Sequence, residues 1–310
     1  MRVGVIGVGH LGRHHARLLA GMDGVTLVGV ADARRERAAE VAAEFGTVGV
    51  ADWQALGAVD AVTIATPTET HAEVALPLIE RGVHVLIEKP LTRTVGEADR
   101  LVAAARAAGI VAAAGHTERF NPAVIAARPL INGPRFIEGH RLGTFPDRSL
   151  DIDVVFDLMI HDLDLVLDLV GEDVDTIEAV GVPVLTPRVD IANVRLRFAG
   201  GCIANLTASR ISRDRVRKLR FFQKDAYLSI DYAAQEVETW RLVRVPGAMP
   251  AIEGGKMDVP HDEPLKRELE DFIGAIREGR APAVPIDHGR RALELAQRIA
   301  ARMAESLGRD

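Results

Sequence analysis

The sequence is poor in cysteine and lysine, and each scarcity narrows the kind of protein that it encodes. Its 310 residues include one cysteine, Cys202, so no disulfide can form within the chain, which favours a reducing, cytoplasmic compartment. Cys202 lies in an apolar run and is expected to be a buried small residue rather than a nucleophile. Lysine occurs five times against thirty-three arginines. A lysine at a special position in such a chain indicates a need for an amine that can release its proton, which arginine cannot do near neutral pH.

Long apolar runs and an excess of positive charge are also missing. No run approaches the roughly 18 apolar residues of a transmembrane helix, and the net charge of -6 argues against nucleic acid as a partner. The ten histidines show no zinc-binding spacing, so we expect no metal site. With 48% apolar and 26% charged residues, the composition is that of a globular protein with one large or two ordinary domains.

The first 120 residues alternate short apolar runs with longer amphipathic ones. This alternation predicts an α/β domain with a doubly wound parallel sheet, which we place at residues 1–120. The strands are expected at Val3–Ile6, Leu27–Ala31, Ala61–Ala65, His84–Ile87 and Ile110–Ala114. The helices are expected at His10–Leu19, Arg34–Phe45, Thr70–Arg81 and Val95–Ala108.

The pattern changes after residue 120, and residues 121–310 are expected to form a second α/β domain with a largely antiparallel open sheet. The last helix is a candidate to pack back on the first domain. The expected helices are Val154–Val170, Pro264–Arg277 and Asp287–Leu307, and Pro246–Pro260 is expected to be a loop. Strand-like segments include Arg135–Arg141, and three further ones are expected to be neighbours: Val194–Phe198, Ile203–Ala208 and Lys218–Gln223.

A glycine-rich motif follows the first predicted strand and opens the first predicted helix. In this context the motif predicts a dinucleotide site in which the backbone approaches a pyrophosphate at the helix N-terminus. Asp32 stands 20 residues beyond the last glycine, where a carboxylate accepts hydrogen bonds from a ribose hydroxyl, which favours NAD. Arg34 follows closely and is suited to the 2'-phosphate of NADP, so NADP remains open. The motif residues are Gly7, Gly9, His10, Leu11 and Gly12.

Two further segments follow predicted strands, at the sheet edge where ligands of doubly wound folds bind. Thr66 and Pro67, with His71 nearby, are expected to line the cofactor. Glu88 and Lys89 end the next strand and are also placed at the cofactor. Pro90 follows Lys89 and removes a backbone donor there; whether that bond is cis is not readable from sequence. A lysine here is a candidate acid-base group, and the alternative is a surface lysine at a strand end.

Carboxylates and a histidine recur on one face of the predicted helix 154–170. Asp157, His161, Asp164 and Asp168 are spaced by four, three and four residues. A carboxylate beside a histidine orients its ring and stabilises its cation, as an acid-base group requires. The alternative is a solvated acidic helix face, with Asp168 its most typical member.

Several polar residues of the second half are candidate substrate ligands. Arg119 and Asn121 follow the last strand of the first domain, where substrate would approach the nicotinamide; a linker turn is the alternative. Arg210 and Arg213 belong to an arginine run around a predicted strand, and alternate arginines there share one face that suits an anion. A solvated sheet edge is the alternative for this run.

Taken together, these motifs resemble the glucose-fructose oxidoreductase, inositol dehydrogenase and rhizopine-catabolism (Gfo/Idh/MocA) family over essentially the whole chain. The resemblance rests on the glycine motif, the segment 65–67 with His71, the segment 88–91, and Asp157 with His161. It implies a Rossmann domain, a second domain used for oligomerisation, and NAD(P)-dependent oxidation or reduction at a sugar or cyclitol carbon. It also implies that Lys89 and His161 are the acid-base pair, supported by Asp157.

One subgroup of this family, which includes UDP-N-acetylglucosamine 3-dehydrogenases, is the most similar around residues 116–122 and 157–162. The resemblance implies a hydride transfer at C3 of a UDP-linked amino sugar, with Arg148, Arg210 and Arg213 suited to its diphosphate. Met159 stands where many family members carry glycine, and this departure argues against simple sugars. A free-sugar or inositol dehydrogenase is the first alternative. A catalytically silent NAD(P)-sensing protein is the second, although a sensor would not need Lys89 and His161.

Overall fold

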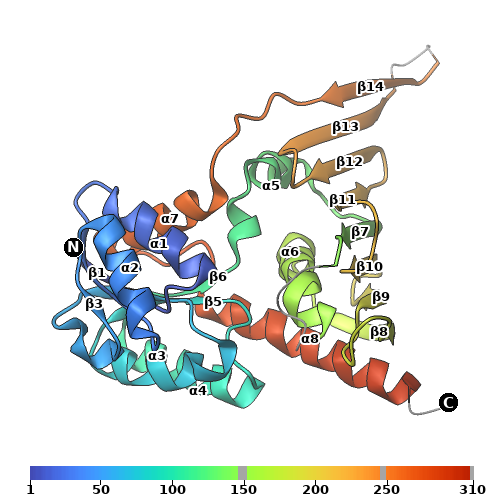
Figure 1. The fold of residues 1–310 in the computed structure, drawn as a ribbon. Helices are drawn as coiled ribbons and strands as arrows, with labels where there is room; N and C mark the ends of the chain where they lie inside the picture. Colours follow the sequence, from blue (N-terminus) through green and yellow to red (C-terminus); the bar gives the residue numbers. More distant parts are fainter. Residues whose placement is uncertain (146–151, 245–248, 308–310) are drawn as a thin grey trace. The chain divides into compact units, whose positions relative to one another are not determined.

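The computed structural model describes residues 1–145, 152–244 and 249–307 and is shown in Figure 1. The chain forms two compact units. The first unit contains residues 1–117 and 265–293, and the second contains residues 118–264 and 294–310. Residues 265–293 thus cluster with the first unit, whereas the sequence analysis placed them in the second domain. Among the described helices, none has the length and apolar character needed to cross a membrane.

The first unit is built on a six-stranded parallel sheet with the order β3-β2-β1-β4-β5-β6. The order reverses between β1 and β4, so the sheet is doubly wound as predicted, and a crevice for ligands is expected at the carboxyl ends of these two strands. The strands are β1 (Arg2–Ile6), β2 (Thr26–Ala31), β3 (Gly49–Val50), β4 (Ala61–Ile64), β5 (His84–Glu88) and β6 (Ala112–Gly115).

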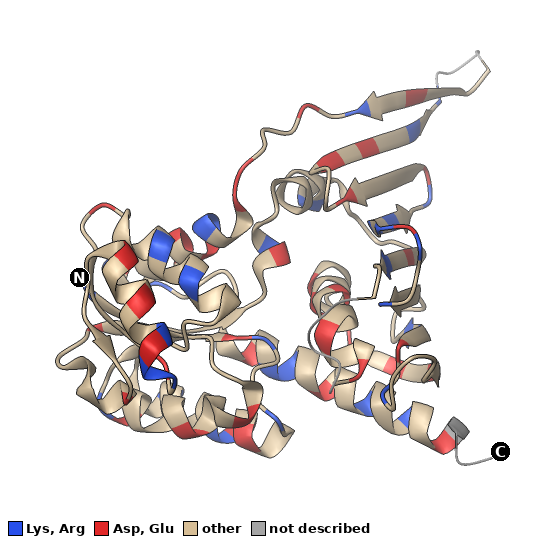
Figure 2. Cartoon of the chain, in the orientation of Figure 1, with Lys and Arg blue, Asp and Glu red and all other residues tan. Residues whose placement is uncertain are grey.

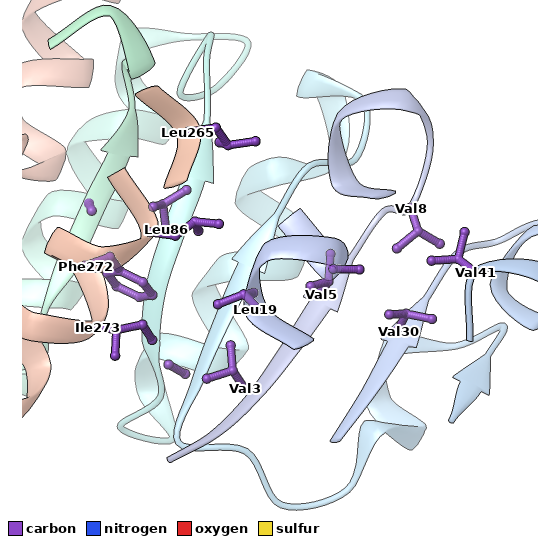
Figure 3. Packing of buried hydrophobic residues seen from close by; sticks show 14 of the residues in the cluster. Val3, Val5, Val8, Leu19, Val30, Val41, Leu86, Leu265, Phe272 and Ile273 are labelled. Carbon is purple, nitrogen blue, oxygen red and sulfur yellow. The ribbon is translucent and has the colours of Figure 1, made fainter. Parts of the chain in front are cut away.

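Helices cover this sheet and close an apolar core around it. Figure 3 shows the core from close by, with Leu265, Phe272 and Ile273 packed in the same cluster as Val3 and Leu86. The three residues belong to α7, whose apolar face explains why a segment so late in the chain joins the first unit. The helices are α1 (His10–Ala20), α2 (Arg35–Phe45), α3 (His71–Glu80), α4 (Val95–Ala108), α7 (Pro264–Glu278) and α8 (Ile286–Leu307), the last of which continues into the second unit.

The second unit contains an eight-stranded sheet with the order β14-β13-β12-β11-β7-β10-β9-β8. All its strand pairs are antiparallel except β10 with β7. Buried and solvent-facing residues alternate along β9, as expected for a sheet with one covered and one open face. The strands are β7 (Phe136–Leu142), β8 (Val174–Val182), β9 (Ile191–Phe198), β10 (Ile203–Ser209), β11 (Val216–Phe222), β12 (Ala226–Asp231), β13 (Glu236–Val243) and β14 (Ala251–Lys256).

The covered face of this sheet carries α5 (Pro122–Ala127), α6 (Ile160–Val170) and the end of α8 (Figure 1). Acidic and basic residues are interspersed along α8 (Figure 2), as is usual for a helix with one solvated face. Two expectations for this unit are wrong. β11 does not pair with β10, because β7 lies between them, and the expected loop at 246–260 contains the strand β14. The β7 insertion reflects a long-range pairing that local sequence does not encode.

Candidate active site

The glycine motif forms a tight turn between β1 and α1. Gly7 has a φ of 84°, and a Cβ atom there would lie 2.6 Å from the backbone of Ala65. A Cβ at Gly12 would lie 1.8 Å from the carbonyl oxygen of Gly7. Gly9, by contrast, has nothing within 4 Å of such an atom, so open space lies in front of its backbone. The helix α1 begins at His10, followed by Leu11, and its N-cap residue, Gly9, makes no side-chain capping hydrogen bond. This arrangement fits a dinucleotide whose pyrophosphate sits at the helix N-terminus.

Asp32 lies directly after β2, beside the glycine turn. Its side chain is 10% exposed. One carboxylate oxygen accepts the Val8 N–H at 3.1 Å, and the other accepts the Arg34 N–H at 3.0 Å. The Arg34 guanidinium contacts the same oxygen through Nε at 3.3 Å but remains largely exposed. Asp32 is thus oriented beside the expected ribose position, and Arg34 lies close enough to approach a 2'-phosphate.

Arg37 has a role at the turn that the sequence analysis missed. Its Nε donates to the Val8 carbonyl at 2.7 Å, and its Nη2 donates to the Gly9 carbonyl at 3.2 Å. A guanidinium that holds two successive carbonyls orients the peptide groups of the glycine turn. The only signal in the sequence was the cluster of arginines after Asp32, which reads equally as a solvated helix start.

Thr66, Pro67 and His71 lie after β4, as expected, but the histidine is turned inward. His71 is buried, and its ring nitrogens contact the carbonyl oxygens of Thr66 at 2.9 Å, Pro90 at 3.1 Å and Leu91 at 3.2 Å. Burial lowers the pKa of His71, and the hydrogen bonds to these carbonyls oppose that shift. The His71 ring therefore links two loops through their carbonyl oxygens, and its expected cofactor contact stays a prediction.

Glu88 ends β5 and is also buried, at 4% exposure. Its carboxylate contacts His15 Nε2 at 3.1 Å and accepts the Lys89 N–H at 3.2 Å. Both carboxylate oxygens thus contact neighbouring protein groups, and the expected cofactor contact of Glu88 stays a prediction. Lys89 follows at the carboxyl edge of the sheet and is partly exposed. The Lys89–Pro90 peptide bond is cis.

Asp157 and His161 lie at the start of the helix that covers the second sheet. The expected α-helix over 154–170 is interrupted: residues Val155–Met159 form a π-helical turn, and α6 begins at Ile160. The extra residue in a π turn shifts Asp157 in phase relative to the α-helical face that carries His161. Both side chains are partly exposed, whereas Asp164 on the same helix is buried. Such single π turns are frequent at functional sites.

Arg119 and Asn121 do not have the open position expected of substrate ligands. The Arg119 guanidinium is buried, and it donates to Asp164 at 2.5 and 2.8 Å and to Asp168 at 2.6 Å. Asn121 caps α5 through the Ala123 N–H at 3.1 Å and donates to the Tyr232 carbonyl at 3.1 Å. Asp168, the most typical member of the alternative solvated face, is therefore paired with the buried Arg119 and is 14% exposed. Buried polar groups need partners inside the protein, which accounts for these pairs. The assignment of Arg119 and Asn121 as substrate ligands stays a prediction.

The three arginines proposed for a diphosphate have different outcomes. Arg210 is 1% exposed and donates to Asp190 at 2.8 Å, to the Ile152 carbonyl at 2.8 Å and to Thr186 at 3.1 Å. It is a structural residue, because its donors are engaged inside the second unit. Arg213 is exposed but precedes β11, so the expected alternation along a strand does not hold for it. Arg148 lies outside the described residues.

The fold and this sheet edge together define an NAD-dependent oxidoreductase with a Rossmann domain. Comparison with family models agrees: residues 1–116 match the oxidoreductase family with an NAD-binding Rossmann fold, and residues 133–228 match the GFO/IDH/MocA C-terminal domain. The chain belongs to the Gfo/Idh/MocA family. The fold class, the family resemblance, the oxidoreductase activity and the NAD cofactor predicted from the sequence are thereby confirmed.

Individual relatives are similar over nearly the whole chain. UDP-N-acetylglucosamine 3-dehydrogenase of Acidithiobacillus ferrooxidans is 42% identical over 304 residues, 96% of each chain. Its solved structure superposes with a TM-score of 0.92 over 97% of each chain. The scyllo-inositol 2-dehydrogenase (NAD(+)) of Bacillus subtilis is 29% identical over 310 residues, 92% of this chain and 88% of the relative. A levoglucosan dehydrogenase solved with NADH and levoglucosan shares the fold, with a TM-score of 0.88 at 22% identity over 98% of this chain and 97% of that one.

Proposed function

We propose that this protein oxidises C3 of a UDP-linked amino sugar and transfers the hydride to NAD+. The observation that carries the proposal is the 42% identity, over 96% of both chains, to a relative that acts on UDP-N-acetylglucosamine. Lys89 supports it from within the chain, as an amine kept at the carboxyl edge of a parallel sheet in a protein with five lysines. The neighbouring inositol and levoglucosan dehydrogenases also act on hydroxyl-bearing rings.

In the proposed reaction, the chain's own residues bind the cofactor and move one proton. The turn at Gly7, Gly9 and Gly12 holds the pyrophosphate, and Asp32 accepts hydrogen bonds from the adenosine ribose. Bound NAD+ supplies the hydride acceptor. Lys89 or His161 takes the hydroxyl proton as the C–H bond breaks, and Asp157 supports the histidine. A positioned base of this kind contributes about two to four orders of magnitude in rate.

The first test is nicotinamide reduction, measured with NAD+ and with NADP+, across UDP-N-acetylglucosamine, free glucose and myo-inositol. Turnover with the UDP-sugar alone is expected. Turnover with a free polyol only would reject the nucleotide-sugar assignment and favour the second candidate, an inositol dehydrogenase. The 29% identity to the scyllo-inositol 2-dehydrogenase supports this second candidate. Tight NAD+ binding without turnover on any of them would favour the NAD(P)-sensing alternative.

Lys89→Met tests the acid-base assignment in the same assay. The methionine side chain keeps much of the length and apolar stem of lysine but has no proton to exchange, so kcat should fall at least about 100-fold. NAD+ affinity, followed by protein fluorescence, should remain within a few-fold of the parent. Full activity in Lys89→Met would sink the role of Lys89 and leave His161 as the base.

The proposal extends to assembly and location. We infer that the protein works as a homo-oligomer, with the second unit forming the substrate-binding and oligomerisation domain, because one face of the second sheet is open (Figure 1). With one cysteine, which is buried, the chain suits a reducing compartment, and a cytoplasmic location is part of the same proposal.

A further inference from the structure

The side chain of Lys89 is flexible, so its amine can be positioned only if the backbone of Lys89 is held rigidly. Its four-carbon stem fixes the amine poorly by itself, and proton transfer requires the reacting atoms to be held close to the productive geometry. The backbone beneath Lys89 is therefore where positioning residues are to be sought. That backbone is held on both sides: the Glu88 carboxylate accepts the Lys89 N–H, and the His71 ring contacts the carbonyl oxygens of Pro90 and Leu91.

Glu88 also forms a buried pair with His15. His15 is 0% exposed and lies on α1, the helix that begins at the glycine turn. Its Nε2 lies 3.1 Å from Glu88 Oε1. Because a carboxylate can only accept, Nε2 donates in this contact. The other carboxylate oxygen accepts the Lys89 N–H at 3.2 Å, so one carboxylate joins α1 to the Lys89 backbone.

Gly115, at the end of β6, lies against the Glu88 carboxylate. A Cβ atom there would lie 2.8 Å from Glu88 Cδ and 2.9 Å from each carboxylate oxygen. Glycine thus provides the space that the carboxylate occupies. A charged group confined in this way cannot easily relax to a second position.

We propose that His15 and Glu88 form a positioning pair that fixes Lys89 and couples it to the nucleotide-binding helix. Glu88 receives the Nε2–H of His15 on one side and the Lys89 N–H on the other, so a shift of α1 is transmitted to Lys89 through a single carboxylate. His71 completes the support by holding the carbonyls of Pro90 and Leu91. This inference rests on the proposed role of Lys89 in catalysis.

The test compares His15→Leu, which removes the donor, with His15→Gln, which keeps an N–H donor on a shorter group. His15→Leu is expected to lower kcat about 10- to 100-fold, the order expected for a misplaced catalytic group. KM and the NAD+ dissociation constant should change less than about threefold, and His15→Gln should restore part of kcat. The solvent deuterium isotope effect on kcat should rise in His15→Leu, because proton transfer becomes slower; a purely structural defect would not raise it.

His84→Leu is the matched control. His84 lies at the opposite end of β5, where its Nδ1 accepts the Val111 N–H at 2.9 Å, so its loss costs one internal hydrogen bond far from Lys89. A thermal-unfolding shift similar to that of His15→Leu is expected, with kcat unchanged. Equal loss of kcat in both variants would overturn the proposal, since general destabilisation would then explain the effect.

Gly115→Ala gives an independent reading if His15→Leu does not fold. The added methyl group displaces the Glu88 carboxylate without touching His15, and kcat should again fall while NAD+ affinity is kept. A folded Gly115→Ala with the kcat of the parent would reject the positioning role. Full activity of Lys89→Met would instead remove the role of Lys89 on which this inference rests, and absence of turnover by the parent protein with the UDP-sugar would reject the proposed function, so the failures are distinguishable.

Discussion

At the scale of single residues, buried arginines in this protein hold the structure together. Arg119, Arg141 and Arg210 are each at most 7% exposed, and each is paired with a buried carboxylate. Arginine keeps its charge even when buried, so such a group needs a partner inside the fold. Arg119 was expected to meet substrate near the nicotinamide and Arg210 to meet a diphosphate. Both guanidinium groups are buried in the fold and paired there, and the two ligand roles stay predictions.

A second prediction at the residue scale concerns Asp32 and the preference for NAD+ over NADP+. Asp32→Ala removes the carboxylate that faces the expected ribose, and it frees Arg34 from its contact at 3.3 Å. A hydrogen bond to a charged group contributes about 1.5–3 kcal/mol, so kcat/KM for NAD+ should fall about 10- to 100-fold. The value for NADP+ should rise or stay constant, since a negative charge near the 2'-phosphate is gone.

Steady-state kinetics with both cofactors measure this change. Asp60→Ala is the matched control, because Asp60 precedes β4 at the opposite edge of the sheet and pairs with Arg2 at 2.7 Å. Its pKa is lowered to about 2 by hydrogen bonds from the side chain and backbone of Arg2. Cofactor preference should be unchanged in the control; an equal change in both variants would contradict the assignment of Asp32.

At the scale of elements, two substitutions in the glycine turn are expected to affect stability and NAD+ binding differently. Gly12→Ala places a methyl group 1.8 Å from the Gly7 carbonyl, so the turn must open and both stability and NAD+ binding should be lost. Gly9→Ala meets nothing within 4 Å and should unfold at the temperature of the parent. Its methyl group occupies the space that the pyrophosphate needs, so NAD+ should bind at least about tenfold more weakly.

Differential scanning fluorimetry with and without NAD+ distinguishes the two glycines. The parent should be stabilised by NAD+, Gly9→Ala much less at the same concentration, and Gly12→Ala should unfold early in both conditions. Undiminished NAD+ stabilisation of Gly9→Ala would show that the cofactor does not approach this part of the turn.

The connection between β8 and β9 is held by one carboxylate and should fail in acid. Asp190 accepts the N–H groups of residues 184–186 at 2.6 to 2.9 Å and the Arg210 Nε–H at 2.8 Å. Burial alone would raise the pKa of Asp190, but the hydrogen bonds from Arg210 and the backbone hold it well below its ordinary value of 3.8. The folded-state pKa is lowered, so the stabilisation is complete above a pH of about 4 and is lost as the pH falls further.

Asp190→Asn should therefore lower the free energy of unfolding at pH 7 by about 3–5 kcal/mol, because it leaves the Arg210 charge buried without its partner. The difference from the parent should narrow as the pH falls below about 4, which urea unfolding at several pH values measures. Glu138→Gln is the control, since Glu138 pairs with Arg220 at a partly exposed site and should cost less than about 1 kcal/mol. A pH-independent difference for Asp190→Asn would contradict the account.

At the scale of the whole molecule, the open face of the second sheet carries a row of aromatic residues. Phe136, Phe222, Tyr227 and Trp240 stand opposite one another across four neighbouring strands. The rings of Phe136 and Phe222 are 5.4 Å apart, and those of Phe222 and Tyr227 are 5.2 Å apart. Phe222 is 36% exposed and Trp240 is 41% exposed in the single chain. Exposed aromatic residues in a contiguous row are typical of protein interfaces.

Trp240→Glu should consequently shift the protein from an oligomer to a smaller species, because a charge would be buried in an apolar interface. Size-exclusion chromatography with light scattering gives the mass directly. Val48→Glu is the control, an equally drastic change at a residue of the first unit that is 61% exposed. The proposal fails if the parent is a monomer, or if Trp240→Glu keeps the mass of the parent.

Local patterns explain how much of the fold and site was predictable. The parallel strands of the first unit are short apolar runs, and the turn between β1 and α1 needs glycine at residues 7 and 12 for steric reasons. Lys89 at a strand end and Asp32 after β2 follow from the same pattern. These features depend on neighbours in sequence, so a reader of the sequence can find them. The family and the cofactor could be predicted because such local motifs recur in related chains.

Other features depend on partners that are distant in sequence. β7 enters between β10 and β11, and α7 packs with β1. Arg210, which follows β10, meets Asp190, which precedes β9. The π turn at Val155–Met159 also escaped prediction, since its residues have the periodicity of an α-helix. In each case the outcome is decided by which groups must be buried together.

The sequence by itself determined the chemistry available to this protein: a nucleotide turn, a carboxylate for ribose, and a rare lysine and a histidine able to carry a proton. Tertiary structure alone decided which polar residues remain open to a ligand. It buried Glu88, His71, Arg119 and Arg210 and left Lys89, Asp157 and His161 partly exposed. The physical reason is that a polar group removed from water must find its partner within the protein, and only the folded chain brings those partners together.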